Sequence, residues 1–432
     1  MAQQEVRIVT KKVRLLYSFL FIPIIRLLFF VASFFNSKAR RGYHGRRNLF
    51  EELEEKITRL SDRTRVWFHA SSLGEFEQAK PIIEILKKAG YNIIVSFFSP
   101  SGYEHSQNYS NADVVTYIPL DSGRNAERFI RVVKPRVVVV MRYDLWMNHL
   151  IAAKEAGAKI IVADATFSVK LMQRAKFLRD FYKEVYSLAD LVLATNSDNK
   201  KMFDYFLGEG ITEVAGDTRF DRVCSRRITN DLSERIPFKI DKSKRIVMIL
   251  GSTWRSDIDI VGEAIKKLAS RFAALLIFIV PHEPTAEEVG RLREQFPEAR
   301  LLSEIKSYES GGVSFLIIDR VGLLTQLYVL GDIAYVGGGF GAGVHSVLEP
   351  AVYGMPIITG PRIERSDEAM QLMQDGALFF IKDSEAAYEM MLRMVENASA
   401  REKAGRIAKD YVDKNLGASS LVADRIMSFS AD

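Results

Sequence analysis

The sequence predicts an α/β protein with two consecutive domains, each built around a parallel, doubly wound sheet. Its 432 residues are roughly three times a common domain length of about 150 residues, which favours more than one domain. From Arg65 onward, short β-branched runs alternate with amphipathic segments, and this alternation is typical of βαβ units around a parallel sheet. The alternation pauses once, in the charged stretch Cys224 to Arg245, and then restarts. We therefore expect the domain boundary within this stretch.

The N-terminal segment, residues 1–45, is predicted to associate with a membrane. Leu15 to Phe35 is an apolar run long enough to cross a hydrocarbon core of about 30 Å as a helix. The first 50 residues contain ten Lys or Arg and one acidic residue, so they account for the net charge of +6. Basic residues flank an apolar helix here, which favours anionic lipids as the partner and argues against nucleic acid. Because they lie on both sides, the helix can either span the bilayer or lie in its interface. A buried N-terminal helix is the alternative.

Cysteine and histidine usage indicates neither a disulfide nor a structural metal. The single cysteine, Cys224, cannot form an intramolecular disulfide, which fits a reducing, cytosolic setting. No pair among the six histidines has the spacing of metal ligands, and no cysteine cluster accompanies them. We expect neither a metal nor a cofactor.

The first motif that could carry chemistry is Ala70-Ser71-Ser72-Leu73-Gly74-Glu75, between an apolar strand and an amphipathic helix. Its small residues let a substrate approach the backbone, and amides at a helix start are free to bind it. Glu75 is a carboxylate at the edge of the predicted sheet, where burial can raise its pKa toward that of a general base. The alternative is that Glu75 only complements the helix dipole.

The second motif, Met141-Arg142-Tyr143-Asp144-Leu145-Trp146, directly follows the buried-looking strand Val137 to Val140. A carboxylate beside a tryptophan suits sugar binding, because hydroxyls need acceptors and sugar rings pack on flat apolar surfaces. A packed tryptophan beside a helix-capping aspartate is an equally simple interpretation.

The predicted second domain places three turns at the carboxyl ends of its strands. Two are Gly251-Ser252-Thr253 and Pro281-His282-Glu283. The third is the glycine run 337–343, which we expect to open a short helix containing Glu349. Amides of such a turn can bind a phosphate, and Glu349 could accept hydrogen bonds from a ribose or a base. A tight turn explains the glycines without any ligand.

Together these segments resemble the 3-deoxy-D-manno-octulosonic acid (Kdo) transferase family, from about Leu15 to Gly417. The most specific pieces are Ser72-Leu73-Gly74-Glu75, Gly251-Ser252-Thr253, and Val336-Gly337-Gly338 with Leu348-Glu349-Pro350. The resemblance implies the GT-B glycosyltransferase fold, with two Rossmann-like doubly wound domains. Residues 46–225 would form the acceptor-binding domain and residues 226–432 the nucleotide-sugar-binding domain.

The resemblance also implies an activity. The protein would transfer Kdo from CMP-Kdo to the glucosamine disaccharide of a lipid A precursor (lipid IVA), with inversion, on the cytosolic face of the inner membrane. Glu75 matches the proposed general base of the family. The candidate acceptor contacts are Ser71, Ser72, Gly74, Asp144 and Trp146. The candidate donor contacts are Gly251, Ser252, Thr253, His282, Gly337, Gly338, Gly339, Gly341, His345, Ser346 and Glu349.

The chain departs from the family pattern at several positions. Arg142 stands where the family commonly has an acidic residue, His282 where it has arginine in Pro-Arg-His, and Leu323 where it usually has glutamate. These departures fit a divergent branch of the family. Two alternatives remain, namely a GT-B transferase or epimerase that uses a UDP-sugar, and a membrane-bound nucleotide-sugar sensor without catalysis.

Overall fold

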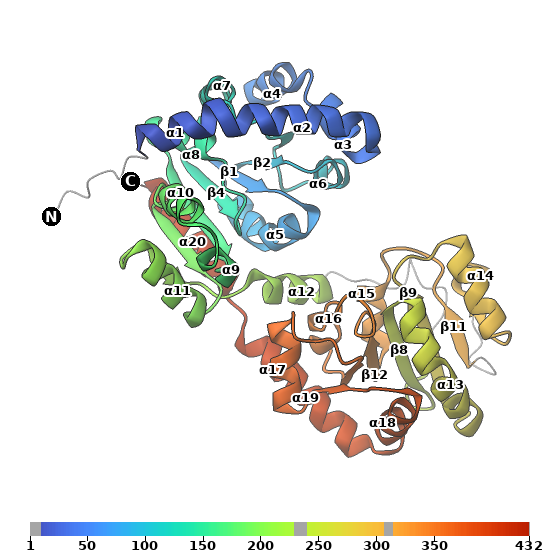
Figure 1. Ribbon diagram of the computed structural model, residues 1–432. Helices are drawn as coiled ribbons and strands as arrows, with labels where there is room; N and C mark the ends of the chain where they lie inside the picture. Colours follow the sequence, from blue (N-terminus) through green and yellow to red (C-terminus); the bar gives the residue numbers. More distant parts are fainter. Residues whose placement is uncertain (1–9, 229–239, 306–313, 432) are drawn as a thin grey trace. The chain divides into compact units, whose positions relative to one another are not determined.

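The computed structural model describes residues 10–228, 240–305 and 314–431 (Figure 1). The chain forms two compact units, Met1–Arg222 with Leu416–Asp432, and Val223–Asn415. The sequence interpretation placed all of residues 226–432 in one domain, whereas residues 416–432 cluster with the first unit. Residues 229–239 of the predicted linker lie outside the described residues.

The first unit is built on a seven-stranded sheet with the order β3-β2-β1-β4-β5-β6-β7, and its described strand pairs are parallel. The strands are β1 (Arg65–Ala70), β2 (Asn92–Phe97), β3 (Val114–Tyr117), β4 (Val137–Met141), β5 (Lys159–Ala165), β6 (Leu191–Ala194) and β7 (Thr212–Val214). Most are apolar along their length because helices cover both faces of the sheet. The predicted α/β class with parallel sheets is confirmed.

Helices of the first unit divide between the two faces of this sheet. They are α4 (Leu49–Thr58), α5 (Leu73–Lys88), α6 (Pro100–Ser106), α7 (Gly123–Val133), α8 (Met147–Glu155), α9 (Val169–Met172), α10 (Lys176–Tyr186), α11 (Ser197–Leu207) and α20 (Ala418–Ala431). Helix α12 (Thr218–Ile228) begins in the first unit and ends in the second. Side chains of α5 and α20 share one core with the sheet, while α4, α7, α8 and α11 share the other. The chain therefore returns through α20 to complete the first unit.

The apolar N-terminal segment forms helices that run along the first unit (Figure 1). They are α1 (Lys11–Leu16), the π-helical turn η1 (Tyr17–Phe21), α2 (Ile22–Phe35) and α3 (Ser37–His44). Val13–Phe35 is long and apolar enough to cross a bilayer, although length and composition alone do not distinguish a membrane span from a signal sequence. Only 11% of its most apolar window is buried. The alternative of a buried N-terminal helix is therefore wrong.

The second unit repeats the architecture with the order β10-β11-β9-β8-β12-β13-β14, again with parallel pairs. Its strands are β8 (Ile246–Thr253), β9 (Leu275–Pro281), β10 (Arg300–Leu301), β11 (Phe315–Ile317), β12 (Ile333–Val336), β13 (Ile357–Thr359) and β14 (Leu378–Phe380). Its helices are α13 (Arg255–Arg271), α14 (Ala286–Gln295), η2 (Leu302–Glu304), α15 (Leu324–Leu327), η3 (Tyr328–Leu330), α16 (Leu348–Ala351), α17 (Asp367–Asp375), α18 (Ser384–Glu396) and α19 (Ala398–Lys414).

The glycine run after β12 is a close-packed turn. A β-carbon on Gly337 would lie 2.3 Å from the carbonyl oxygen of Ser252, and one on Gly339 would lie 2.6 Å from the amide nitrogen of Gly360. Backbone atoms cannot move aside as a side chain can, so these positions require glycine. Residues 344–347 separate the turn from α16, which has four residues. The expectation that the run opens directly into a helix was therefore wrong.

Candidate active site

The first unit carries Glu75 and Asp144 at the point where its strand order reverses. β1 lies between β2 and β4, and doubly wound sheets bind ligands beyond the carboxyl ends of the strands at such a switch point. Glu75 lies in the first turn of α5, directly after β1, and Asp144 follows β4. The structure therefore brings the two carboxylates to one edge of the sheet.

Glu75 is held by the start of helix α5. The Ser72 hydroxyl caps the helix by accepting a hydrogen bond from the Glu75 amide at 3.4 Å. The Glu75 Oε2 atom in turn accepts a hydrogen bond from the Ser71 amide at 2.6 Å. The side chain of Ser71 also interacts with the Glu75 carboxyl group. Ser71 thus fixes the Glu75 carboxylate at the start of α5.

Burial tunes the acidity of Glu75, which is only 5% exposed. Burial raises the pKa of the Glu75 carboxyl above its ordinary value, and the nearby Asp144 raises it further. The hydrogen bond from Ser71 and the interaction with His69 lower the pKa, but burial outweighs them. A carboxylate with a raised pKa is a better proton acceptor near neutral pH.

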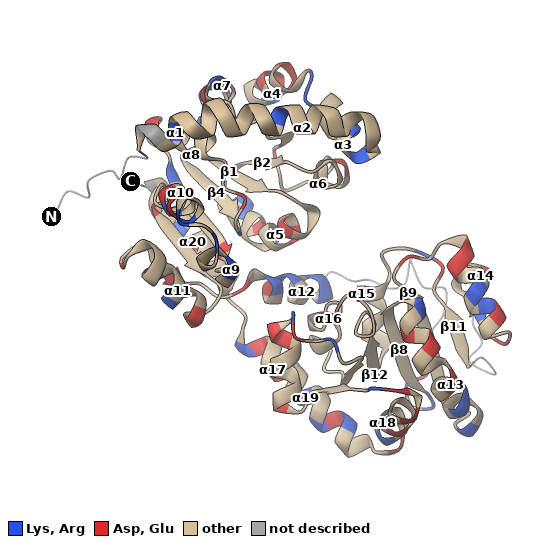
Figure 2. Ribbon diagram, viewed as in Figure 1, with Lys and Arg blue, Asp and Glu red and all other residues tan. Residues whose placement is uncertain are grey.

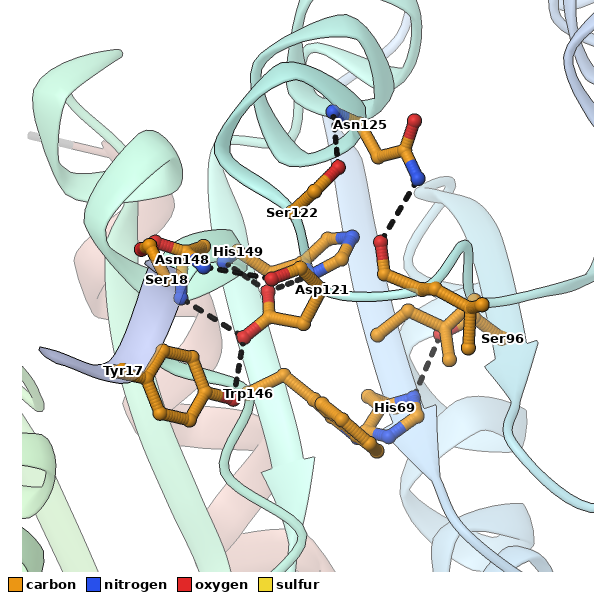
Figure 3. A network of polar contacts seen from close by, with 12 residues as sticks. Tyr17, Ser18, His69, Ser96, Asp121, Ser122, Asn125, Trp146, Asn148 and His149 are labelled. Atoms are coloured by element: carbon orange, nitrogen blue, oxygen red, sulfur yellow. Dashed lines mark hydrogen bonds and ion pairs between the residues drawn. The ribbon is translucent and has the colours of Figure 1, made fainter. Parts of the chain in front are cut away.

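A chain of hydrogen bonds orients Asp144. The Trp67 Nε1–H group donates to Ser96 Oγ at 2.7 Å, and Ser96 Oγ lies 2.9 Å from His69 Nδ1. His69 Nε2 lies 2.9 Å from Asp144 Oδ2. Because Ser96 already accepts from Trp67, its hydroxyl proton is free for Nδ1 of His69. The Nε2–H group then donates to Asp144. Figure 3 shows the contact between His69 and Ser96.

Some of the candidate acceptor residues make contacts within the fold, and all of them remain at least partly exposed to solvent. The Trp146 Nε1–H group donates to Asp144 Oδ2 at 3.2 Å, and its ring stacks on Phe98 with 5.1 Å between centroids. The Asp144 side chain keeps 23% of its surface exposed. Ser71 and Ser72 are half-buried, and Gly74 is exposed. Both interpretations of the second motif, packing and ligand contact, are therefore compatible with this geometry.

Sequence reasoning missed His69 and Ser96. They are paired residues of the adjacent strands β1 and β2, and each is a buried polar side chain near the end of an apolar strand. That pattern was the signal available in the sequence. It could not show that the two side chains meet, because strand register was unknown.

A buried carboxylate, Asp121, attaches the N-terminal segment to this edge of the unit (Figure 3). Asp121 is 1% exposed. It accepts hydrogen bonds from the Tyr17 hydroxyl at 2.7 Å, from the amides of Asn148 and His149 at 3.1 and 2.9 Å, and from His149 Nδ1. The Ser18 hydroxyl also donates to Asn148 Oδ1 at 3.0 Å. Asp121 therefore caps α8 and holds η1 against it.

Backbone strain marks the same edge of the sheet. Arg142 and Asp164, at the ends of β4 and β5, have φ values of 63° and 52°, which are uncommon for residues other than glycine. Asp164 is buried and accepts a hydrogen bond from the Thr218 amide at 3.1 Å. Burial, with the nearby Asp217, raises the pKa of Asp164 to about 7. Such strain concentrates at functional sites.

The second unit has a pocket of about 420 Å³ at the carboxyl ends of β8 and β9. Three predicted donor contacts line it, namely Ser252, His282 and Glu349. Ser252 has a φ of 51°, so the strained backbone recurs here. The pocket also contains Arg226, Arg320 and Gln326, which the sequence did not single out. Arg226 lies in α12, Arg320 follows β11 and Gln326 lies in α15, so no local motif connects them.

The other predicted donor contacts do not line this pocket. Thr253 is buried, and a β-carbon on Gly251 would lie 2.2 Å from the Tyr328 hydroxyl oxygen. His345 accepts a hydrogen bond from Trp254 Nε1–H at 2.8 Å and stacks on His282, with 4.4 Å between ring centroids. Burial, with His282 nearby, lowers the pKa of His345. Ser346 is exposed.

Several amides of the glycine turn are already bonded within the fold. The amide of Gly337 donates to the Gly251 carbonyl, and the amides of Gly341 and Gly343 donate to the Gly338 carbonyl. The Gly338 amide donates to Asp257 Oδ2 at 2.9 Å. These four amides are therefore not available to a phosphate. A helix of four residues also has a much smaller dipole than a long one.

We predict that Asp121→Asn destabilises the first unit by about 3 kcal/mol, because an amide cannot accept all the hydrogen bonds of the buried carboxylate. For a unit of this size the melting temperature should fall by about 6 to 12 °C. Thermal unfolding followed by tryptophan fluorescence measures the change. Asp62→Asn, at an exposed position, is the control. Equal melting temperatures for the two variants would contradict the role of Asp121.

Comparison with known proteins identifies the family. Residues 43–222 match the family model of 3-deoxy-D-manno-octulosonic-acid transferase (kdotransferase). The 3-deoxy-D-manno-octulosonic acid transferase of Aquifex aeolicus is 25% identical over 81% of this chain and 92% of its own length. That of Chlamydia muridarum is 25% identical over 82% of this chain and 83% of its own length.

Solved structures show the fold. UDP-GlcNAc 2-epimerase from Neisseria meningitidis has a TM-score of 0.62 at 15% identity, and the match covers 84% of this chain and 100% of that one. Acinetobacter baumannii MurG has a TM-score of 0.52 at 13% identity, with coverage of 84% and 99%. The chain is a glycosyltransferase of GT-B fold, and its residues 43–222 form a domain that matches the 3-deoxy-D-manno-octulosonic acid transferase family.

Proposed function

We propose that the protein transfers Kdo from CMP-Kdo to the glucosamine disaccharide of a lipid A precursor, lipid IVA. The observation that carries this proposal is the buried Glu75 at the switch point of the first sheet, fixed by Ser71 and close to Asp144. Its relatives from Aquifex and Chlamydia carry the name of the same transferase. The donor is a substrate, and the proposed chemistry uses no further cofactor and no metal.

The proposed reaction is a single displacement with inversion. A hydroxyl of the acceptor attacks the anomeric carbon of Kdo, and Glu75 accepts the hydroxyl proton. The bond between the anomeric carbon and the phosphate oxygen breaks, and its electron pair leaves with CMP. The Glu75 carboxylate suits proton transfer, because the hydrogen bond from the Ser71 amide to Oε2 fixes its orientation.

Asp144 and Trp146 are proposed to bind the acceptor sugar. The partly exposed Asp144 carboxylate offers acceptors to sugar hydroxyls, and its bonds to His69 and Trp146 fix its direction. Its negative charge also raises the pKa of Glu75. In the second unit, Ser252, His282 and Glu349 are proposed donor contacts because they line one pocket.

We infer that the N-terminal helix binds the cytosolic face of the inner membrane and lies in its interface. Phe19, Leu27 and Leu28 are 77%, 61% and 62% exposed, and Figure 2 shows Lys and Arg on α3 beside this apolar helix. A spanning helix would leave the folded unit, yet Tyr17 is bonded to Asp121 and Arg14 to Glu155. An apolar helix with basic flanks suits an interface that contains anionic lipids.

The first test of the proposed function is Kdo transfer from enzymatically generated CMP-Kdo to lipid IVA. We expect product from the wild type and a loss of about a hundredfold or more in Glu75→Gln, because the amide cannot accept the proton. Glu84→Gln, on the same helix, is the control and should transfer normally. UDP-GlcNAc serves as the second donor in the same assay. Turnover with UDP-GlcNAc and none with CMP-Kdo would refute the proposed donor.

The raised pKa of Glu75 predicts opposite effects of pH on activity and stability. Transfer should increase as pH rises through this pKa, above the ordinary value of 4.5, because the base must be deprotonated. The folded state holds the Glu75 proton more tightly than the unfolded chain does. Its contribution to stability is therefore present at low pH and lost as pH rises through the raised pKa.

Removing the negative charge of Glu75 should therefore prevent this loss of stability at high pH. We expect Glu75→Gln to melt at or above the wild-type temperature at pH 8, with a smaller difference toward pH 4, in thermal unfolding across that range. A variant that melts well below the wild type at pH 8 would show that the Glu75 carboxylate stabilises the fold.

The membrane inference predicts that combining Phe19→Ser, Leu27→Ser and Leu28→Ser weakens vesicle binding at least tenfold. Each buried apolar side chain contributes about 1.5 to 3 kcal/mol, so the expected loss is large. Co-sedimentation with vesicles of phosphatidylethanolamine and phosphatidylglycerol measures it. Tyr205→Ser, an equally exposed aromatic position on α11, is the control. Unchanged binding of the triple variant would contradict the inference, and resistance to alkaline carbonate extraction would indicate a spanning helix.

A further inference from the structure

The pocket of the second unit combines an excess of positive side chains with hydrogen-bond acceptors. Arg226 and Arg320 line it together with a single carboxylate, that of Glu349. The Gln326 Oε1 atom is buried and has no hydrogen-bond partner among the described residues. Positive groups suit an anion, while free acceptors suit amino or hydroxyl groups. A nucleotide carries both kinds of group.

Four amides of the glycine turn are not available to a phosphate. The amides of Gly337, Gly338, Gly341 and Gly343 are bonded within the turn or to neighbouring strands and helices. The helix that follows, α16, has only four residues. A phosphate bound at this edge of the sheet therefore needs a positively charged side chain to balance its charge.

Arg320 is placed to supply that charge. Arg226 already lies 3.9 Å from the Glu349 carboxylate. Arg320 forms no hydrogen bond or ion pair within the described residues, and it is exposed at the wall of the pocket. Its neighbour Asp319 is not paired with it among the described residues, and the Asp319 carboxylate accepts hydrogen bonds from the amide and hydroxyl of Ser303 instead.

Strand order places Arg320 next to the predicted donor contacts. It follows β11, and β11 pairs with β9, whose end carries His282. In a parallel sheet both residues lie at the same edge. The planar guanidinium group can bind two phosphate oxygens at once, which lysine cannot do.

We propose that Arg320 binds the phosphate of the nucleotide donor. The proposal rests on the proposed function, since it takes the activated sugar to be a nucleotide derivative bound by the second unit. Arg320 is a binding residue for the donor and for the departing nucleotide. Electrostatic stabilisation of the leaving phosphate is the effect that it would have on the reaction.

Cytidine lacks the phosphate of CMP, so the difference between their binding affinities measures the contribution of the phosphate contact. Calorimetric titration of the full chain in detergent micelles gives both affinities for the wild type, Arg320→Ala and Arg320→Lys. We expect Arg320→Ala to bind CMP about tenfold to a hundredfold more weakly, because a charge-assisted hydrogen bond is lost. Cytidine should bind equally to both proteins, and Arg320→Lys should recover part of the CMP affinity. Arg406→Ala, an exposed arginine on α19, controls for the change in net charge.

The possible outcomes test the role of Arg320 and the identity of the donor separately. Unchanged CMP affinity in Arg320→Ala, or an equal loss for CMP and cytidine, would overturn the role of Arg320. If the wild type prefers UMP to CMP, the proposed donor is wrong, and the comparison of UMP with uridine tests Arg320 in the same way. A wild type that binds no nucleotide would overturn the proposal, while the transfer assay decides on the proposed function separately.

Discussion

The parallel direction of all strands within each sheet is the constraint that places the chemistry of this protein. Parallel strands end at one common edge, so residues far apart in the sequence meet there. Glu75 and Asp144 meet in this way in the first unit, and Ser252 and His282 in the second. Left-handed backbone at Arg142, Asp164 and Ser252 lies at the same edges. Such strain is retained where neighbouring elements hold it.

Asp121 connects this edge to the apolar N-terminal segment. Burying a carboxylate is costly unless its oxygens are bonded, and four donors from Tyr17, Asn148 and His149 meet that need. Helix α8 begins directly after Trp146. The carboxylate that caps α8 therefore also fixes the end of the loop that carries Asp144. The position of the apolar N-terminal segment and that of the Asp144 loop consequently depend on one buried network.

The sequence predicted the fold more fully than the site, for physical reasons. Buried parallel strands are apolar along their length, so the runs at β4 and β9 were visible at once. The contact of Tyr17 with Asp121 joins residues 104 positions apart, and no local pattern encodes such a pair. The glycine run was ambiguous, because close backbone packing and phosphate binding need the same residue. Helix α20 was assigned to the second unit because an amphipathic pattern does not identify the sheet that it covers.

Glu75 shows why a structural and a catalytic interpretation of one residue need not compete. As a residue of the first helical turn it accepts a hydrogen bond from the Ser71 amide, and that bond lowers its pKa. The same position buries the carboxyl beside Asp144, and burial raises the pKa by more than the hydrogen bond lowers it. The hydrogen bond therefore supplies orientation and burial supplies basicity. If Glu75 were only a cap, glutamine could replace it fully, since an amide oxygen accepts the Ser71 bond equally well. Only proton transfer from the acceptor requires the carboxylate itself.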